Sequence, residues 1–152
     1  LRGGSPLQNL IQRGHRETQI TALRCVAELD AGPIYMKRPL CLGGAASEIF
    51  LRAAGIIESM IEDIIRLEPV PQEQKGEITT FRRRTPDESD LDRAQISNLH
   101  EFFDFIRMLD ADGYPKAFIQ YGGYRYEFSR ANIYDGRIVA DVKITKIEED
   151  SR

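Results

Sequence analysis

A chain of 152 residues is long enough for one domain, or for one domain with a small appendage, and it can bury a substantial core. Hydrophobic residues make up 41% and charged residues 30%, as in ordinary soluble proteins, and no run of 18 uncharged apolar residues predicts a membrane span. The net charge of −3 argues against a nucleic-acid partner, because such proteins usually carry a clustered positive surface.

The cysteines and histidines indicate neither a disulfide framework nor a metal site. Cys25 and Cys41 have no other Cys or His at ligand spacing, and His15 and His100 are isolated. We therefore expect no bound metal and a reduced protein of the cytoplasm. The first residues do not read as a signal peptide and lack an initiator Met, so we also expect an excised or truncated piece.

The first elements in chain order are a short helix and two strands. A helix is expected over residues 6–13, with Ser5 as its cap. Residues 18–26 are expected to form a strand, and their lack of clean alternation is typical of a strand covered on both faces. A second strand over residues 34–36 is expected to end before Pro39, which cannot donate a ladder hydrogen bond.

The longest predicted helix covers residues 45–67. Its apolar residues recur at helical spacing, with three further isoleucines beside the main face: Ile49, Ala53, Ile56, Met60 and Ile64, flanked by Ile57, Ile61 and Ile65. A strand is expected over residues 77–83, followed by an acidic loop. Ser97 is expected to cap a third helix over residues 98–109, whose inward side chains are Leu99, Phe102, Phe103, Ile106 and Leu109.

The last part of the chain is expected to be β structure. Residues 118–121, 124–134 and 137–147 are candidate strands, and the pairs Gly122-Gly123 and Asp135-Gly136 are strong two-residue hairpin turns. The order of elements therefore predicts the back half of an α/β domain, followed by a small, separate antiparallel β subdomain.

Residues 21–35 read as a strand, a tight turn that holds Asp30, and a second strand. Asp and Gly are ordinary turn residues, so this segment alone favours a structural role for Asp30. A carboxylate fixed at the end of a buried strand can also serve in catalysis, where it orients a partner imidazole or accepts a proton through water.

Five segments together carry a resemblance to a known family. The turn in residues 28–34, Glu-Leu-Asp-Ala-Gly-Pro-Ile, resembles the Leu-Asp-x-Gly signature of enzymes that transfer a formyl group from formyltetrahydrofolate. Residues 2–8 and 17–21 resemble the family's Arg-Gly-x-x-Pro-x-Gln segment and the strand that follows it. Residues 81–89, which contain Arg-Arg-Thr-Pro-Asp-Glu-Ser, and residues 106–118 are similar to sugar N-formyltransferases. The likeness covers nearly the whole chain in the family's order.

The resemblance implies a fold and a set of functional residues. Residues 1–95 would be part of a Rossmann-like formyltransferase domain, and residues 96–152 would be a linking helix with a small, OB-like β subdomain. Formyltetrahydrofolate would be the formyl donor, and no metal would be needed. The implied roles are catalysis for Asp30, contact with the folate for Val26, Glu28 and Leu29, and contact with the acceptor for Arg2, Gly3, Arg83 and Arg84.

The family pairs this Asp with an Asn and a His on a strand that precedes the Arg-Gly segment. Neither residue stands in that position here, because the sequence begins at Leu1. The resemblance therefore implies that this piece alone is inactive and that the full gene product is active.

Three functions compete at this point. The first is a sugar N-formyltransferase acting on a nucleotide-linked amino sugar, whose diphosphate would suit the guanidinium groups of Arg83 and Arg84. The second is methionyl-tRNA formyltransferase, against which the acidic net charge argues. The third is a non-catalytic binding or assembly module that uses Tyr121, Tyr124 and Tyr126 as a contact surface. Relatives often form homodimers, and no membrane partner is expected.

Overall fold

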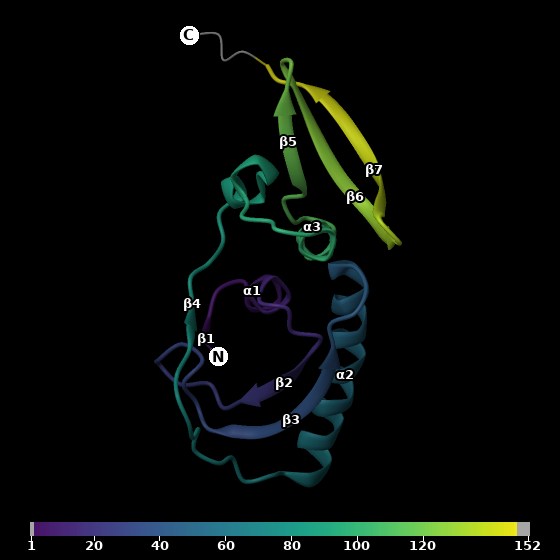
Figure 1. Ribbon diagram of the computed structural model, residues 1–152. Coiled ribbons are helices and arrows are strands. Elements are labelled where there is room, and N and C mark those ends of the chain that lie inside the picture. The colour runs from purple at the N-terminus through teal and green to yellow at the C-terminus, as the bar shows by residue number, and fades with distance from the viewer. Residues whose placement is uncertain (1, 149–152) are drawn as a thin grey trace. The chain divides into compact units, whose positions relative to one another are not determined.

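Residues 2–148, the part of the chain that the computed structural model describes, combine helices with three small sheets (Figure 1). Contacts divide the chain into two units, Leu1–Arg84 and Thr85–Arg152. The expected combination of α/β structure with a small antiparallel sheet in the C-terminal part of the chain is confirmed. The Rossmann-like character of the first part and the functional division at residue 95 stay predictions. Among residues 2–148, no helix combines the length and the apolar character that crossing a membrane requires.

The first unit opens with a two-residue strand and the short helix α1. Strand β1 (Arg2–Gly3) pairs in parallel with β4 (Thr80–Phe81), and α1 covers Pro6–Gln12. Ser5 stands at the expected cap position, but its side chain does not cap the helix. Ser5 has a φ of 50°, and its hydroxyl accepts the backbone N–H of Arg84 at 3.2 Å instead of an N–H of α1. The expected strand over residues 77–83 is wrong in extent, because only two of its residues pair with the equally short β1.

Strands β2 (Glu17–Leu23) and β3 (Ile34–Cys41) form an antiparallel pair. Strand β2 ends three residues earlier than expected, because the chain leaves the ladder at Leu23 to form the loop of residues 24–33. Strand β3 runs through Pro39, which was expected to lie beyond its end. Apart from a single bridge between Ile34 and Gln72, β3 pairs in the described residues with β2 alone, and a strand at a sheet edge tolerates a residue without an N–H.

Helix α2 (Ala46–Leu67) packs along β3 and β2 (Figure 1). It begins within one residue of the predicted start, where the Glu48 carboxylate accepts the backbone N–H of Ala45 at 2.7 Å. The predicted inward face is confirmed, since all five of its residues are buried or half-buried. The buried stripe is narrower than the run of apolar residues, because the flanking isoleucines are exposed: Ile57, Ile61 and Ile65.

One ionic link joins α2 to β3 and gives a testable pH dependence. The Asp63 carboxylate accepts hydrogen bonds from Arg66 at 2.7 Å and from Arg38, on β3, at 2.9 Å. These guanidinium groups, Arg66 first, hold the pKa of Asp63 below its ordinary value of 3.8. Because the folded-state pKa is the lower one, the stabilisation is present above pH 3.8 and is lost as the pH falls through the folded-state pKa.

We expect Asp63→Asn to lower the urea midpoint slightly at neutral pH and to make it less sensitive to acid below about pH 4. The measurement is a series of urea unfolding curves against pH. The control is Glu62→Gln, which removes the exposed carboxylate at the preceding position. If Asp63→Asn and the parent lost stability in parallel on acidification, the proposed link would be wrong.

The second unit begins with two short 3₁₀ turns, Pro86–Ser89 and Leu91–Arg93, and continues with α3 (Leu99–Arg107). The helix is found where expected, but its cap is Asn98, whose side-chain oxygen accepts the N–H of Glu101 at 3.0 Å, and not Ser97. Most of the predicted inward residues are buried or half-buried, whereas Leu99, in the first turn, is 41% exposed.

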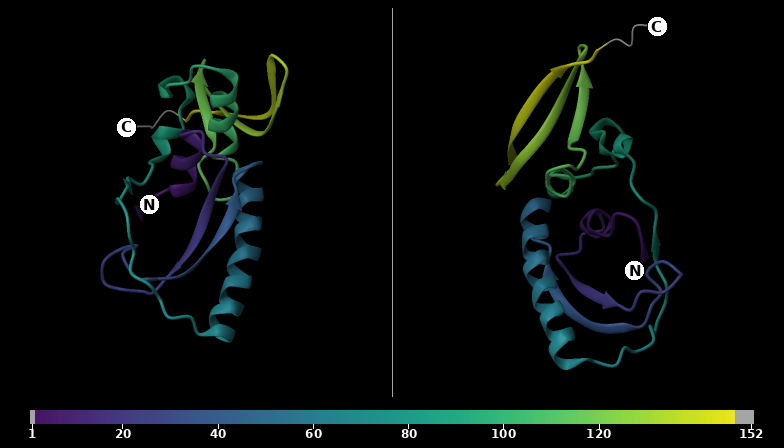
Figure 2. Two further views of the ribbon diagram at one scale, coloured as in Figure 1. Left: turned by 60° about the horizontal axis from the view of Figure 1, so that its bottom comes forward. Right: turned by 180° about the vertical axis from the view of Figure 1, so that it is seen from behind.

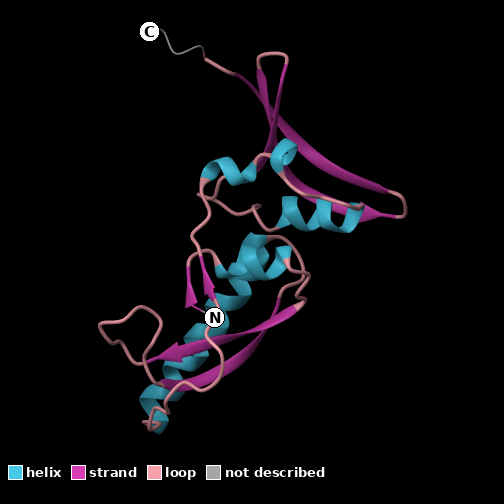
Figure 3. Cartoon of the chain, turned by 60° about the vertical axis from the view of Figure 1, so that its left-hand side comes forward, coloured by secondary structure: helices cyan, strands magenta, loops and turns pink. Residues whose placement is uncertain are grey.

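Strands β5 (Ala117–Tyr121), β6 (Tyr124–Tyr134) and β7 (Arg137–Lys146) form one antiparallel sheet in this order (Figures 2 and 3). Both predicted two-residue turns are confirmed by the register, which pairs Tyr121 with Tyr124 and Tyr134 with Arg137. Helix α3 packs on β6 and β7. The register of β6 against β7 shifts between Ser129 and Asn132.

Candidate active site

The loop of residues 24–33 holds Asp30 in an unusual backbone conformation. Asp30 has a φ of 53°, in the left-handed region that Asp adopts more readily than most residues. The base of the loop is closed by the N–H of Arg24, which donates to the carbonyl of Pro33 at 2.8 Å. A side chain at position 32 would overlap the carbonyl oxygen of Arg24, so only glycine fits there. The glycine of the Asp-x-Gly sequence is therefore a steric requirement of this turn, and Asp30 suits its left-handed position.

The first residues of the chain hold this loop from one side. The backbone N–H of Gly3 donates to the Asp30 carboxylate (Oδ2) at 3.0 Å, and Arg2 forms an ion pair with Glu28 at 2.8 Å. The Arg2 side chain is 16% exposed, whereas that of Glu28 is 75% exposed, so the pair fixes orientation more than it adds stability. Three of the predicted site residues, Arg2, Gly3 and Asp30, are thus brought together across 27 positions of sequence.

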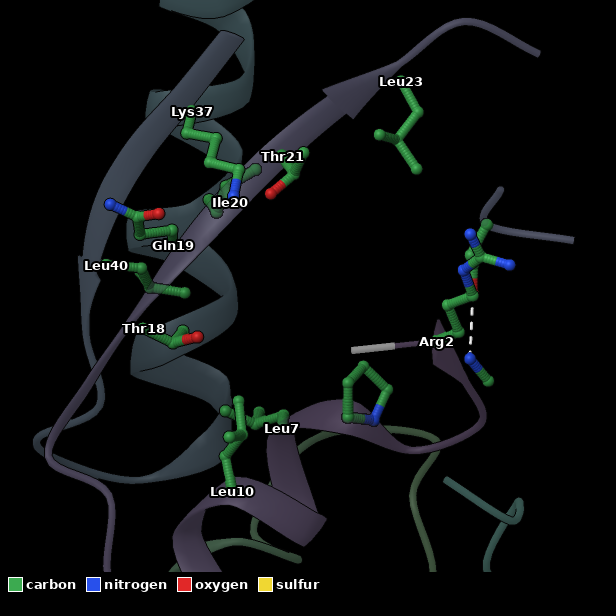
Figure 4. A pocket seen from close by; sticks show the side chains of 13 residues that line it. Arg2, Leu7, Leu10, Thr18, Gln19, Ile20, Thr21, Leu23, Lys37 and Leu40 are labelled. Atoms are coloured by element: carbon green, nitrogen blue, oxygen red, sulfur yellow. Dashed lines mark hydrogen bonds between the residues drawn. The ribbon is translucent and has the colours of Figure 1, made fainter. Parts of the chain in front are cut away.

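A cleft of about 560 Å³ opens beside this contact within the first unit (Figure 4). In Figure 4 strand β2 contributes Thr18 and Thr21, β3 contributes Lys37, and α1 contributes Leu7 and Leu10. The full lining consists of Arg2, Gly3, Pro6, Leu7, Leu10, Thr18, Gln19, Ile20, Thr21, Leu23, Asp30, Lys37 and Leu40.

A second, smaller cleft of about 260 Å³ adjoins the loop. Its lining includes all three residues predicted to contact folate, Val26, Glu28 and Leu29. Val26 is 43% and Leu29 75% exposed, so the loop presents uncovered apolar surface there. Asp30 lines both clefts and is therefore placed between them.

The two predicted phosphate ligands lie elsewhere in the same unit. Arg83 and Arg84 do not line either cleft. The Arg84 guanidinium donates to the Gln12 side chain at 3.1 Å, and Arg83 is exposed with its backbone against Gly4. Their proposed contact with an acceptor diphosphate stays a prediction.

Sequence reasoning missed Lys37, Thr18 and Thr21 as cleft residues. Lys37 is placed there by the strand register, which sets it opposite Thr21. No local pattern marks that register, because it depends on where the loop between the strands begins and ends. The cleft consequently contains an exposed carboxylate and an exposed ammonium group, a combination suited to binding a polar substrate. Within residues 2–148, His, Cys, Asp and Glu side chains form no cluster of three that could hold a metal ion.

Comparison with known proteins supports a similarity to formyltransferases. Residues 86–145 match the family model described as the C-terminal domain of methionyl-tRNA formyltransferase. A solved structure named methionyl-tRNA formyltransferase, from Clostridium thermocellum, is 51% identical and superposes with a TM-score of 0.90, over 95% of this chain and 63% of that one. The chain is therefore similar to formyltransferases over nearly its whole length. The resemblance inferred from the five segments is confirmed.

Other proteins match over most of the chain at lower identity. A methionyl-tRNA formyltransferase of Streptococcus pyogenes is 26% identical over 97% of this chain and 49% of its own length. A sugar N-formyltransferase of Shewanella sp shares the fold, with 15% identity and a TM-score of 0.61, over 92% of this chain and 55% of that one. HypX of Aquifex aeolicus, solved in complex with tetrahydrofolic acid, has 20% identity and a TM-score of 0.60, over 86% of this chain and 23% of that one.

These formyltransferase relatives change the balance between the predicted acceptors. The chain was expected to be nearest to sugar N-formyltransferases, but the relatives reported above with the higher identities carry the methionyl-tRNA name. The chain spans about half the length of the curated formyltransferases that it matches.

Proposed function

We propose that this chain is the C-terminal part of an enzyme that moves the formyl group of formyltetrahydrofolate to an amine, with Asp30 as a catalytic residue. One observation carries the proposal: Asp30 lies between two clefts, and the N–H of Gly3 fixes one of its carboxylate oxygens at 3.0 Å. A transfer enzyme needs such a group between its donor and its acceptor. The family relationship supports the reaction class.

The chemistry requires a group that manages charge and protons. When an amine attacks the formyl carbon, an oxyanion develops on the formyl oxygen. As this intermediate collapses, the bond from the formyl carbon to the folate nitrogen breaks, the attacking nitrogen loses a proton and the released folate nitrogen gains one. A carboxylate at Asp30 would accept that proton through water or orient an imidazole that does so. The Asn and His that the family pairs with this Asp would come from the longer protein, so we propose that the complete site exists only there.

The smaller cleft is the proposed donor side. The exposed apolar surface of Val26 and Leu29 suits the flat ring system of a folate, since burial of that surface would favour binding. HypX, solved in complex with tetrahydrofolic acid, shares this fold and makes a folate ligand consistent with it.

We propose methionyl-tRNA as the acceptor. The 51% identity to an enzyme of that name, over 95% of this chain, supports it more strongly than the motif around Arg83 and Arg84 supports a nucleotide-linked amino sugar. The net charge of −3 argues against a tRNA acceptor, but net charge says little about one local surface. The amino sugar remains the second candidate because of the Arg-Arg-Thr-Pro-Asp-Glu-Ser segment.

A formyl-transfer assay tests both parts of the proposal. The longer protein is expected to formylate charged initiator tRNA with formyltetrahydrofolate, in a salt-sensitive manner, and to leave a panel of nucleotide-linked amino sugars unmodified. The 152-residue chain alone is expected to transfer no formyl group to either acceptor. Turnover on a sugar would replace methionyl-tRNA with the amino sugar as the proposed acceptor. Turnover by the chain alone would show that Asp30 is not part of a split site. Inactivity of the longer protein on all acceptors would favour a binding or assembly module.

A further inference from the structure

The Asp30 turn has a second anchor, Gln74, in the segment that connects α2 to β4. The side-chain nitrogen of Gln74 donates to two backbone carbonyls, those of Asp30 and Gly32, both at 2.8 Å. These two residues flank the tight part of the turn. One side-chain amide therefore joins both ends of the turn across 44 and 42 positions of sequence.

The orientation of the Gln74 amide is determined by its surroundings. Backbone carbonyl oxygens only accept hydrogen bonds, so the NH₂ end of the amide must face them. The oxygen end accepts a hydrogen bond from Arg2 at 3.4 Å, and Arg2 also pairs with Glu28 of the same loop. All the main hydrogen-bonding capacity of the amide is consequently directed at the loop or at the residue that contacts it.

The backbone that carries Gln74 is itself held in place. Two residues earlier, Gln72 forms a pair of backbone hydrogen bonds with Ile34, the first residue of β3, at 2.7 and 2.9 Å. Strand β3 starts where the Asp30 loop ends, so the amide projects from a support that is fixed to the same strand. This arrangement limits the movement of Gln74 relative to the loop.

We propose that Gln74 is a positioning residue for Asp30. Its amide fixes the carbonyls of residues 30 and 32 and thereby holds the carboxylate where it accepts the hydrogen bond from the N–H of Gly3. The inference rests on the proposed catalytic role of Asp30. A left-handed backbone at a residue other than glycine persists only where its surroundings hold it. Gln74 supplies this restraint at the backbone of the turn, and Gly3 supplies it at the carboxylate.

The test compares Gln74→Glu with Lys75→Gln in the protein that carries this chain. Gln74→Glu keeps the shape of the side chain but places a carboxylate oxygen against two carbonyl oxygens. Lys75→Gln makes the same change in net charge at the next, exposed position. Gln74→Met, which removes the hydrogen bonds without adding charge, provides a second variant if the first folds poorly.

Two readouts separate positioning from general stability. In hydrogen exchange, Gln74→Glu is expected to speed exchange of the Gly3 amide and of the loop of residues 24–33 about tenfold, with no change in β7 and none in Lys75→Gln. In kinetics, Gln74→Glu is expected to lower kcat about tenfold and to leave KM for the folate donor within about twofold. Adding Gln74→Glu to Asp30→Asn is expected to lower kcat no further than Asp30→Asn does alone.

Each outcome decides one of the two claims. Unchanged exchange in the loop, or an equal loss of turnover in the presence and absence of the Asp30 carboxylate, would overturn the positioning role. If Asp30→Asn itself keeps normal turnover, the proposed catalytic role fails, whereas the exchange measurement still shows whether Gln74 anchors the turn.

Discussion

Asp30→Asn, in the longer protein, is expected to lower kcat by about 100-fold or more while KM for the acceptor and the folate donor changes by less than about threefold. An amide keeps the size of the side chain, and its oxygen can still accept the N–H of Gly3, so the loop should keep its conformation. The amide cannot accept a proton or stabilise a cationic imidazole. The loss should therefore appear in turnover and not in binding, and steady-state kinetics with both substrates measures it.

The matched control is Asp112→Asn, the same change at an exposed turn position in the second unit. It should leave both kinetic constants within about twofold. Near-normal turnover in Asp30→Asn would remove Asp30 from the mechanism. A large rise in KM with kcat unchanged would instead make it a binding residue.

The parts of the fold that sequence predicted well are those fixed by local periodicity. The sequence predicts helix α2 to within one residue at its start and correctly at its end. Its apolar residues recur at helical spacing, and Pro69 follows its end. The exposure of Ile57 and Ile61 could not be predicted, since a wide apolar stripe does not say which part of it the neighbouring strands cover. Strand β3 was predicted too short because Pro39 was treated as a stop, and an edge position tolerates it.

The candidate site shows the same limit. The Asp-x-Gly turn is recognisable from the sequence because its last position requires glycine and its first position favours a residue such as Asp. The two contacts that hold it, from Gly3 and from Gln74, come from 27 and 44 positions away, and nothing in the local pattern connects them. Lys37 was missed for a similar reason, because its place in the cleft follows from the register of β2 and β3.

Gly32→Ala is expected to be nearly as damaging to turnover as the loss of the carboxylate, although it removes no functional group. The added methyl group would overlap the carbonyl oxygen of Arg24, which is backbone and cannot swing aside. The base of the loop must then open, which also strains the hydrogen bond from Arg24 to Pro33 and the one from Gln74 to residue 32. We expect a loss of about 1–3 kcal/mol in the free energy of unfolding. We expect turnover to fall about 100-fold, since a shift of about 1 Å at a catalytic group costs that much.

Gly55→Ala separates this effect from a general sensitivity to alanine. Gly55 lies inside α2, and a methyl group there would meet no atom within 4 Å. Alanine is the better helix former, so this variant should gain about 0.5–1 kcal/mol in the free energy of unfolding and keep its turnover. If the loop is as tightly closed as described, urea unfolding gives stability changes of opposite sign for the two variants. Steady-state kinetics then shows a loss of turnover in Gly32→Ala alone. A Gly32→Ala protein with parental stability and turnover would mean that the loop relaxes at no cost, and Asp30 would then not depend on a rigid turn.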